Sequence, residues 1–345
     1  MALEKIYVNN FTVFENLEIE FCDGINVLIG ENGTGKTHLL KVLYAFCESD
    51  TLSQGSKLLF PETLAQCFFT EQLRTLFHQS MNPLDITIDI NQKKYGYQAA
   101  VRKELSKEAQ LKPPLSDLEI LFQIDGPRTR EKVKTAFIPA KDMLTHAGIE
   151  KDYVERYIPF DKTLIDILFK SGMSELRELS PAAQNALAVI GNIIGGTVLF
   201  ENNTYYIRRE DQEISFQSEA EGFKKLSVLW RLIETGLIER GTILFWDEPE
   251  ANINPKYIPQ LVDILYALQA AGVQIVLATH DYVLAKYIEL KRTSDEAVRF
   301  HSLYFDDHHV VKAESNPLFQ ELNKNSIAEA YNRLLDDVFE LTIRG

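Results

Sequence analysis

Two carboxylates stand at the end of an apolar run in the stretch TILFWDEPE, residues 242–250. The run predicts a buried strand, and Asp247 and Glu248 follow it directly. Side chains at the end of a buried strand lie at the edge of a sheet, where carboxylates can hold a divalent cation or accept a proton. The chemistry therefore depends on which other motif reaches the same edge.

A phosphate-binding loop is the partner motif that the sequence offers. GENGTGKT, residues 30–37, fits GxxxxGK[ST], follows the strand-like GINVLI and precedes a helical apolar pattern. Glycines let backbone N–H groups turn inward around phosphates, and the helix N-terminus adds its positive dipole end. We expect nucleotide contacts from Gly30, Glu31, Asn32, Gly33, Thr34, Gly35, Lys36, Thr37 and His38.

The two motifs together predict a division of roles around ATP and Mg²⁺. Lys36 is expected to reach the β- and γ-phosphates, and Thr37 and Asp247 to hold Mg²⁺. Glu248 is placed to accept a proton from an attacking water. The alternative is a connecting glycine-rich turn and an acidic surface, but both motifs in one chain favour the catalytic interpretation.

The residues after the carboxylates carry a resemblance to a known class. DEPEANINP, residues 247–255, resembles the Walker B and D-loop run of ABC-class ATPases. After a predicted helix at 257–271, VQIVLATHD predicts a buried strand that ends in His280. His280 resembles the switch histidine of that class, which implies a hydrogen bond to the γ-phosphate. The resemblance implies an α/β fold of the ABC type of P-loop NTPase, with a mixed central sheet and a long inserted helical lobe.

A degenerate signature motif lies at residues 218–236, SEAEGFKKLSVLWRLIETG, where the apolar spacing predicts a helix. In ABC-class ATPases the signature of a second copy closes on the γ-phosphate. If Gly222 is the signature glycine, the serine position falls on Ala220, and the implied contacts are Ala220, Glu221 and Gly222. Lys224 or Lys225 could replace the missing hydroxyl. The alternative is an ordinary capped helix.

The spacing between motifs separates branches of this class. Lys36 and Gly222 lie 186 positions apart (222 minus 36), far more than in transporter subunits, and the insert has no sustained heptads. The chain resembles RecF-like and OLD-like ABC ATPases, especially the stand-alone AAA-type ATPases encoded in bacterial anti-phage defence systems. This implies ATP hydrolysis at a head-to-tail homodimer interface, or in a higher oligomer, that controls a separate nuclease or toxin. A RecF-like DNA-binding ATPase in repair and a slow ATP sensor stay open.

Net charge and hydropathy limit the partners and the cellular location that the sequence predicts. The net charge of −14 opposes binding of nucleic acid over the whole surface, although a local basic groove stays open at 126–134 or at Arg208-Arg209. Those two stretches are more typical of solvated loops or hairpin faces. The N-terminus lacks the apolar region of a signal peptide, which predicts a cytoplasmic protein. The uncharged segment 181–200 predicts a buried helix running into a strand, not a membrane span.

The organisation along the chain predicts two lobes. Residues 1–48 and 197–345 are expected to form the ATP-binding core, and residues 49–196 an inserted, largely helical lobe with a β-hairpin at 85–90 and 95–101. Further predicted elements are a helix at 61–79, strands at 117–125 and 135–138, and helices within 141–195. The tail predicts strands at 298–305 and 310–313 and a helix at 318–339.

Overall fold

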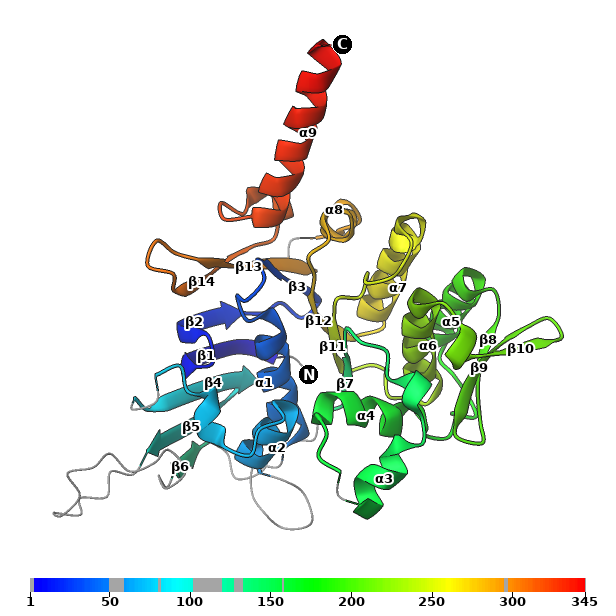
Figure 1. The fold of residues 1–345 in the computed structure, drawn as a ribbon, viewed down its shortest axis with the longest axis horizontal. Coiled ribbons are helices and arrows are strands. Elements are labelled where there is room, and N and C mark those ends of the chain that lie inside the picture. Colours follow the sequence, from blue (N-terminus) through cyan, green and yellow to red (C-terminus); the bar gives the residue numbers. More distant parts are fainter. Residues whose placement is uncertain are drawn as a thin grey trace.

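Three sheets organise the structure, a computed structural model that describes residues 3–49, 59–79, 82–101, 120–126, 133–156, 158–294 and 297–344. The described strands are β1 (Leu3–Phe11), β2 (Phe14–Glu20), β3 (Ile25–Gly30), β4 (Leu84–Ile90), β5 (Lys93–Val101), β6 (Ile120–Asp125), β7 (Thr135–Ile138), β8 (Thr197–Glu201), β9 (Thr204–Arg209), β10 (Gln212–Ser215), β11 (Ile243–Asp247), β12 (Gln274–Ala278), β13 (Val298–Phe305) and β14 (Val311–Asn316). The strand orders are β14-β13-β3-β12-β11-β7, β2-β1-β4-β5-β6 and β10-β9-β8 (Figure 1).

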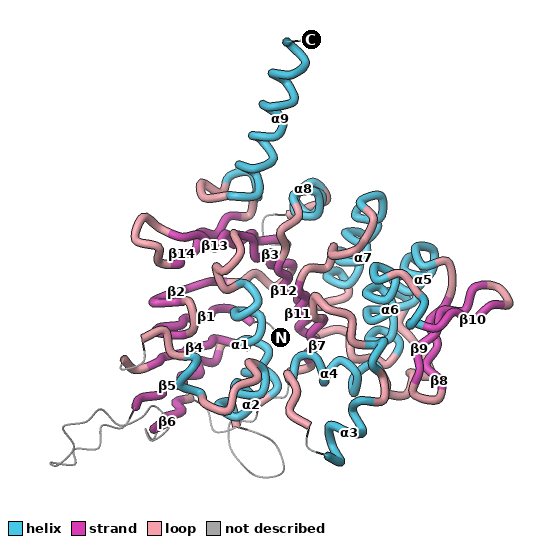
Figure 2. The backbone as a smooth tube through the Cα atoms, in the orientation of Figure 1, coloured by secondary structure: helices cyan, strands magenta, loops and turns pink. Residues whose placement is uncertain are grey.

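Helices cover the six-stranded sheet on both sides, as the backbone trace in Figure 2 shows. The described helices of the whole molecule are α1 (Lys36–Glu48), α2 (Phe60–Cys67), α3 (Ile149–Arg156), α4 (Lys162–Ser171), α5 (Pro181–Ile194), α6 (Glu221–Glu234), α7 (Ile258–Ala270), α8 (Tyr282–Leu290) and α9 (Ser326–Arg344). In the six-stranded sheet β14 is antiparallel to β13, whereas β13, β3, β12, β11 and β7 run parallel. The mixed central sheet confirms the predicted α/β fold class.

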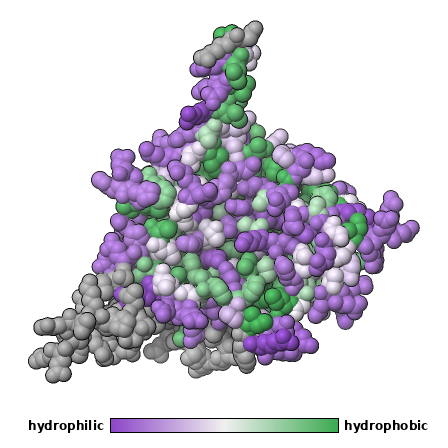
Figure 3. All heavy atoms as spheres, in the orientation of Figure 1, coloured by the Kyte–Doolittle hydropathy of each residue, from purple (hydrophilic) through white to green (hydrophobic). Residues whose placement is uncertain are grey.

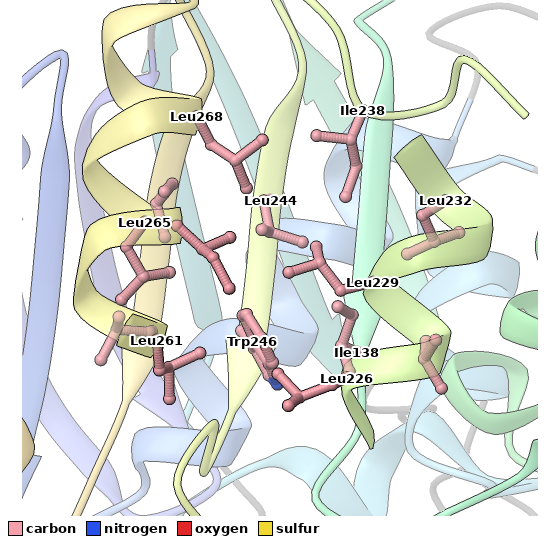
Figure 4. Packing of buried hydrophobic residues seen from close by; sticks show 14 of the residues in the cluster. Ile138, Leu226, Leu229, Leu232, Ile238, Leu244, Trp246, Leu261, Leu265 and Leu268 are labelled. Carbon is pink, nitrogen blue, oxygen red and sulfur yellow. The ribbon is translucent and has the colours of Figure 1, made fainter. Parts of the chain in front are cut away.

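Strand β11 shows how the sequence separates the two halves of the core. Ile243 and Phe245 belong to the apolar cluster that contains α1 and the five-stranded sheet. Leu244 and Trp246 belong to the other cluster, with α6 and α7 (Figure 4). Successive side chains of a strand point to opposite faces, so a continuous apolar run is required when both faces are covered. The apolar run before Asp247 is therefore explained by a strand buried on both sides.

Most predicted elements are present where the sequence placed them. The predicted hairpin is β4 and β5, which pair antiparallel, and the predicted tail strands are β13 and β14. The segment 181–200 is α5 followed by β8, and Ser180 caps α5 by accepting a hydrogen bond from the Ala183 N–H at 3.2 Å. No helix among the residues that the structure describes has the length and apolar content needed to cross a membrane.

Two predicted helices have different bounds. The helix expected at 61–79 is wrong beyond Cys67, because Phe69 adopts a left-handed φ of 50° and the Thr70 N–H closes on the Ala65 carbonyl at 3.0 Å. The helix expected at 318–339 begins only at Ser326. Asn325 accepts a hydrogen bond from the Ala328 N–H at 3.0 Å, which caps the helix there.

The segment 49–196 supplies strands to two sheets. β4 pairs with β1 in the five-stranded sheet, and β7 pairs with β11 in the six-stranded sheet. The division into a core lobe (1–48 and 197–345) and an inserted lobe (49–196) stays a proposal about the chain's organisation.

The two basic stretches have different outcomes. The basic stretch at 126–134 falls mainly on residues outside the described ranges. Arg208 pairs with Glu213 at 2.6 Å across the β9–β10 hairpin, as expected for a hairpin face.

Helix α9 stands out from the body of the molecule (Figure 1). Its base is held by a stacked pair of rings, Tyr331 on α9 and Tyr282 on α8, with centroids 3.9 Å apart. Beyond this stack the helix carries an apolar surface that Figure 3 shows in green. Its members are between 50% and 72% exposed: Leu334, Leu335, Val338, Phe339, Leu341 and Ile343.

A buried histidine in the six-stranded sheet gives a stability prediction. His301 on β13 is fully buried, its Nδ1 lies 2.7 Å from the Ser315 hydroxyl, and burial lowers its pKa from 6.5 to about 3. Below pH 6.5 the unfolded chain binds a proton that the folded chain excludes, so this residue's contribution to stability falls as pH drops from 6.5 toward 3. The stability advantage of the wild type over His301→Gln should therefore shrink with falling pH, by an amount of the order of a few kcal/mol.

Urea unfolding of both proteins between pH 7.5 and 4.5 measures this difference, and comparing two variants cancels the titration of other groups. Ser315→Ala removes the partner hydroxyl but no titrating group, so it should keep the pH slope of the wild type. A pH-independent difference between wild type and His301→Gln would contradict the assignment.

Candidate nucleotide-binding site

The parallel strands bring three separated segments to one edge of the sheet. β3, β12 and β11 are neighbours in that order, and each ends at this edge. The phosphate loop follows β3, His280 follows β12, and Asp247 ends β11. The carboxyl ends of parallel strands are where ligands of open α/β sheets bind.

The phosphate loop has the conformation that a cradle for an anion requires. Gly33 and Gly35 have φ values of 85° and 89°, in the left-handed region that favours glycine. A Cβ at Gly35 would lie 2.5 Å from the Phe14 ring, so a larger residue would not fit there. Lys36 begins α1, and its ammonium donates to the carbonyls of Gly30 and Glu31, both at 2.8 Å. The Lys36 ammonium therefore lies against the phosphate loop, where it is predicted to bind phosphates.

Burial disfavours the charged form of the Lys36 side chain. Burial lowers its pKa from 10.5 to about 8, against the opposing effect of Asp247, Glu248 and Glu31. A lowered lysine pKa means that the ammonium lacks full compensation in the folded chain. A bound polyphosphate would supply the missing negative charge, so the loop fits an anionic ligand.

The predicted metal ligands meet across 210 positions of sequence. The Thr37 hydroxyl donates to both carboxylate oxygens of Asp247, at 3.0 and 3.3 Å. Asp247 is 8% exposed, and burial raises its pKa while the hydroxyl opposes that shift. A hydroxyl and a carboxylate are hard oxygen donors of the kind that Mg²⁺ prefers. The residues present therefore fit Mg²⁺ held next to the phosphate loop.

Glu248 and His280 face each other at the open side of the site. His280 Nε2 lies 3.8 Å from Glu248 Oε1, and their side chains are 37% and 40% exposed. Burial and the nearby Lys36 lower the pKa of His280, while Glu248 opposes the shift. A neutral imidazole at pH 7 can donate one hydrogen bond and accept another. Glu248 itself has a left-handed φ of 49°, which is uncommon for a residue with a side chain.

Two residues at the site were not given these roles from the sequence. Glu250 Oε1 accepts a hydrogen bond from the Thr279 hydroxyl at 2.6 Å and lies 3.3 Å from the His280 N–H, and burial raises its pKa to about 7. Lys225 donates to the backbone carbonyl of Glu248. The available signal was a third carboxylate in DEPE and a threonine at the end of the next strand.

The other residues predicted to contact the nucleotide differ in their exposure to solvent. Glu31, Asn32 and Gly33 are exposed, whereas Thr34 is buried and donates from its hydroxyl to the Glu31 carbonyl at 2.8 Å. His38 lies on α1 with its ring 5.2 Å from that of Phe68. Burial lowers its pKa, and its Nδ1 has no hydrogen-bond partner among the described residues. Its nearest aromatic contact thus lies on the side of α2.

The predicted signature residues lie at the start of α6. Ala220 is the exposed N-cap residue and Glu221 is exposed, but Gly222 is buried. A Cβ at Gly222 would lie 2.4 Å from the Asn252 carbonyl oxygen, so this glycine allows α6 to pack on the loop after β11. Among the residues that the structure describes, no hydrogen bond or ion pair joins these three residues to the phosphate loop.

The two lysines of this segment make contacts within the chain. Lys224 pairs with Glu221 at 2.7 Å and Lys225 reaches the Glu248 carbonyl, and both lysines are buried. Their ammonium groups are therefore engaged within this chain.

Solved structures share the fold at low sequence identity. The SMC head bound to the C-winged helix domain of ScpA is 13% identical, with a TM-score of 0.57 over 93% of this chain and 100% of that one. An SMC head with an extended coiled coil, bound to the C-terminal domain of ScpA and derived from Pyrococcus furiosus, is 11% identical, with a TM-score of 0.53 over 97% and 99%.

Curated relatives match over a short segment. The DNA replication and repair protein RecF of Oceanobacillus iheyensis is 48% identical over 61 residues, which is 17% of this chain and 16% of that protein. RecF of Listeria welshimeri is 51% identical over 43 residues, 12% of each chain. The matched segment thus spans about one sixth or less of these relatives.

A family model covers most of the chain. The model described as "AAA domain, putative AbiEii toxin, Type IV TA system" matches residues 25–286. This range contains the phosphate loop, the residues at the end of β11 and His280. The chain therefore belongs to this AAA-domain family.

Proposed function

We propose that the protein binds ATP with Mg²⁺ and hydrolyses it at a head-to-tail homodimer interface, and that this cycle controls a separate effector, a nuclease or toxin, in bacterial anti-phage defence. The observation that carries the proposal is the hydrogen bond from Thr37 to Asp247, with Lys36 and the Glu248–His280 pair at the same sheet edge. This arrangement provides a cation for phosphates, oxygens for a metal, and a carboxylate with access to water.

Each residue has one proposed task. Lys36 and the backbone N–H groups of the loop would bind the β- and γ-phosphates, and Thr37 and Asp247 would hold Mg²⁺. When bound, Mg²⁺ supplies charge neutralisation at the phosphates. Glu248 would take the proton of the attacking water, and its 40% exposure leaves room for that water. His280 would orient the γ-phosphate through its imidazole.

A second copy is proposed because the signature residues are not joined to the phosphate loop of their own chain. The exposed Ala220 and Glu221 at the start of α6 would face the nucleotide of the partner copy. The proposed effector is supported by the exposed apolar surface of α9, since such surfaces mark contacts with other proteins. The family description, which names a putative AbiEii toxin and a type IV toxin–antitoxin system, supports a role in such a system.

A DNA-binding ATPase is the second candidate, and the RecF segments favour it. The net charge of −14 argues against it. ATP turnover measured with and without double-stranded DNA separates the two proposals: stimulation by DNA favours the RecF-like function, and a rate independent of DNA favours control of a protein effector.

Replacing Glu248 should separate binding from catalysis. Glu248→Gln keeps the side-chain volume but removes the proton acceptor, so ATP should still bind while turnover falls about 10²- to 10⁴-fold. If cleavage releases the dimer, this variant should accumulate as an ATP-bound assembly in light scattering. Asp247→Asn should instead weaken Mg²⁺-dependent binding and build up no such assembly.

Glu201→Gln, at an exposed position on β8, is the matched control and should behave as the wild type. Wild-type turnover in Glu248→Gln would refute Glu248 as the general base.

Mixed dimers test whether sites are shared between copies. Gly222 is unsuitable for this test, since a larger residue would collide with Asn252 of its own chain. Ala220→Trp places the bulk on the exposed N-cap instead, so it should keep ATP binding and lose turnover. Lys36→Ala should lose ATP binding, because it removes the buried cation of the loop.

A mixture of Ala220→Trp and Lys36→Ala chains should regain part of the activity, because one composite site in each mixed dimer has both parts intact. Two folded proteins that show no regained turnover on mixing would argue against shared sites.

A further inference from the structure

Glu250 is a half-buried carboxylate beside the proposed site that the roles above do not use. One of its oxygens, Oε1, lies 2.6 Å from the Thr279 hydroxyl and 3.3 Å from the His280 N–H, 29 and 30 positions along the chain. The other oxygen, Oε2, is buried without a hydrogen-bond partner among the described residues. A carboxylate buried with part of its hydrogen-bonding capacity unfilled costs stability.

The contacts of Glu250 continue into the segment that carries His280. The Thr279 hydroxyl, which donates to Glu250, accepts in turn from the Asp281 N–H at 2.9 Å. Asp281 then caps α8 by accepting from the Leu284 N–H at 2.5 Å. The backbone on both sides of His280 is thereby tied, through Thr279, to one side chain that follows β11.

One lysine and one aspartate act electrostatically on this side chain. Lys225 is the basic group whose charge interacts with Glu250, and it also donates to the Glu248 carbonyl, while Asp281 is the acidic neighbour. Glu248 and Glu250 are thus held on the same short turn, one facing solvent and the other facing the β12 loop. The distance between the imidazole of His280 and the carboxylate of Glu248 depends on how that loop is held.

We propose that Glu250 is a positioning residue for ATP hydrolysis, which fixes the Thr279–His280 segment so that the imidazole of His280 faces Glu248 across the site. The inference rests on the proposed function. Glu250 does not reach the reacting atoms itself; it acts through the backbone of His280. Removing its carboxylate should therefore change turnover and leave nucleotide affinity intact, since its hydrogen bonds go to Thr279 and His280, whereas Lys36 bonds to the carbonyls of Gly30 and Glu31.

Glu250→Ala should lower kcat about 10- to 100-fold, the range seen when a residue that orients a catalytic ligand is removed. The dissociation constant of a fluorescent ATP analogue should stay within about twofold of the wild type, because the loop keeps its charge-assisted contacts. Glu250→Gln should regain most of the lost turnover, since its amide oxygen can accept from the same hydroxyl and N–H. Thr279→Val should lower kcat in the same direction, and it keeps the test available if Glu250→Ala fails to fold.

Glu289→Ala is the matched control. Glu289 is a buried carboxylate that, like Glu250, accepts from a backbone N–H, here that of Gln320 at 3.1 Å, but it lies on α8 away from the site. This variant should lose thermal stability and keep kcat. The signal of the His280 imidazole in spectra of the histidine-labelled protein gives a readout without turnover: it should shift in Glu250→Ala and return toward the wild type in Glu250→Gln.

Three outcomes overturn the inference in different ways. If Glu248→Gln loses turnover but Glu250→Ala and Thr279→Val keep the wild-type kcat and the His280 signal, ATP hydrolysis at this site stands and the positioning role of Glu250 falls. If the wild type shows no turnover that depends on Glu248, the proposed function falls and the role of Glu250 falls with it. An equal loss of kcat in Glu289→Ala would show a general effect on stability and would also overturn the inference.

Discussion

The hydrogen bond between the Thr37 hydroxyl and the Asp247 carboxylate, 3.0 Å long, is the contact on which the organisation of the site depends. It joins the start of α1 to the end of β11, and it can form only because β3, β12 and β11 are parallel neighbours that end at one edge. Parallel strands need crossover connections, and here helices cover the sheet and bury both faces. The packing of apolar strands between two layers therefore forms the core and also brings the site residues together.

Charge burial is the second feature that the site elements share. Lys36, Asp247 and Glu250 are all held with pKa values shifted toward their neutral forms, and burial is the leading cause for each. Shifts of this kind concentrate at functional sites, because groups poised for a ligand are incompletely compensated without it. The left-handed backbone of Glu248 adds a strained residue at the same turn. Several ionisable groups at this edge of the sheet therefore lack a full set of oppositely charged partners. A bound charged ligand would supply the missing charge.

Much of the fold could be predicted because the relevant signals are local. The glycine-rich loop before an apolar helical pattern identified β3 and α1, and the apolar run before Asp247 identified β11, since a strand buried on both faces has no polar alternation. Helix boundaries were less accurate. The helix from Phe60 ends at Cys67 because of the backbone at Phe69, and α9 starts at Ser326 because Asn325 caps it. Both depend on single backbone turns that apolar periodicity does not report.

The sequence by itself determined the residue types of the proposed site, the strands that carry them and the helix after the loop, because spacing and composition encode local structure. Only the tertiary structure decided which groups meet. It placed Thr37 against Asp247 and His280 opposite Glu248. In the folded chain Lys225 donates to the Glu248 carbonyl, and Gly222 is buried against Asn252. The tertiary structure also brought Glu250 to the loop after β12. Contacts between residues tens to hundreds of positions apart follow from strand order and packing, which no local pattern specifies.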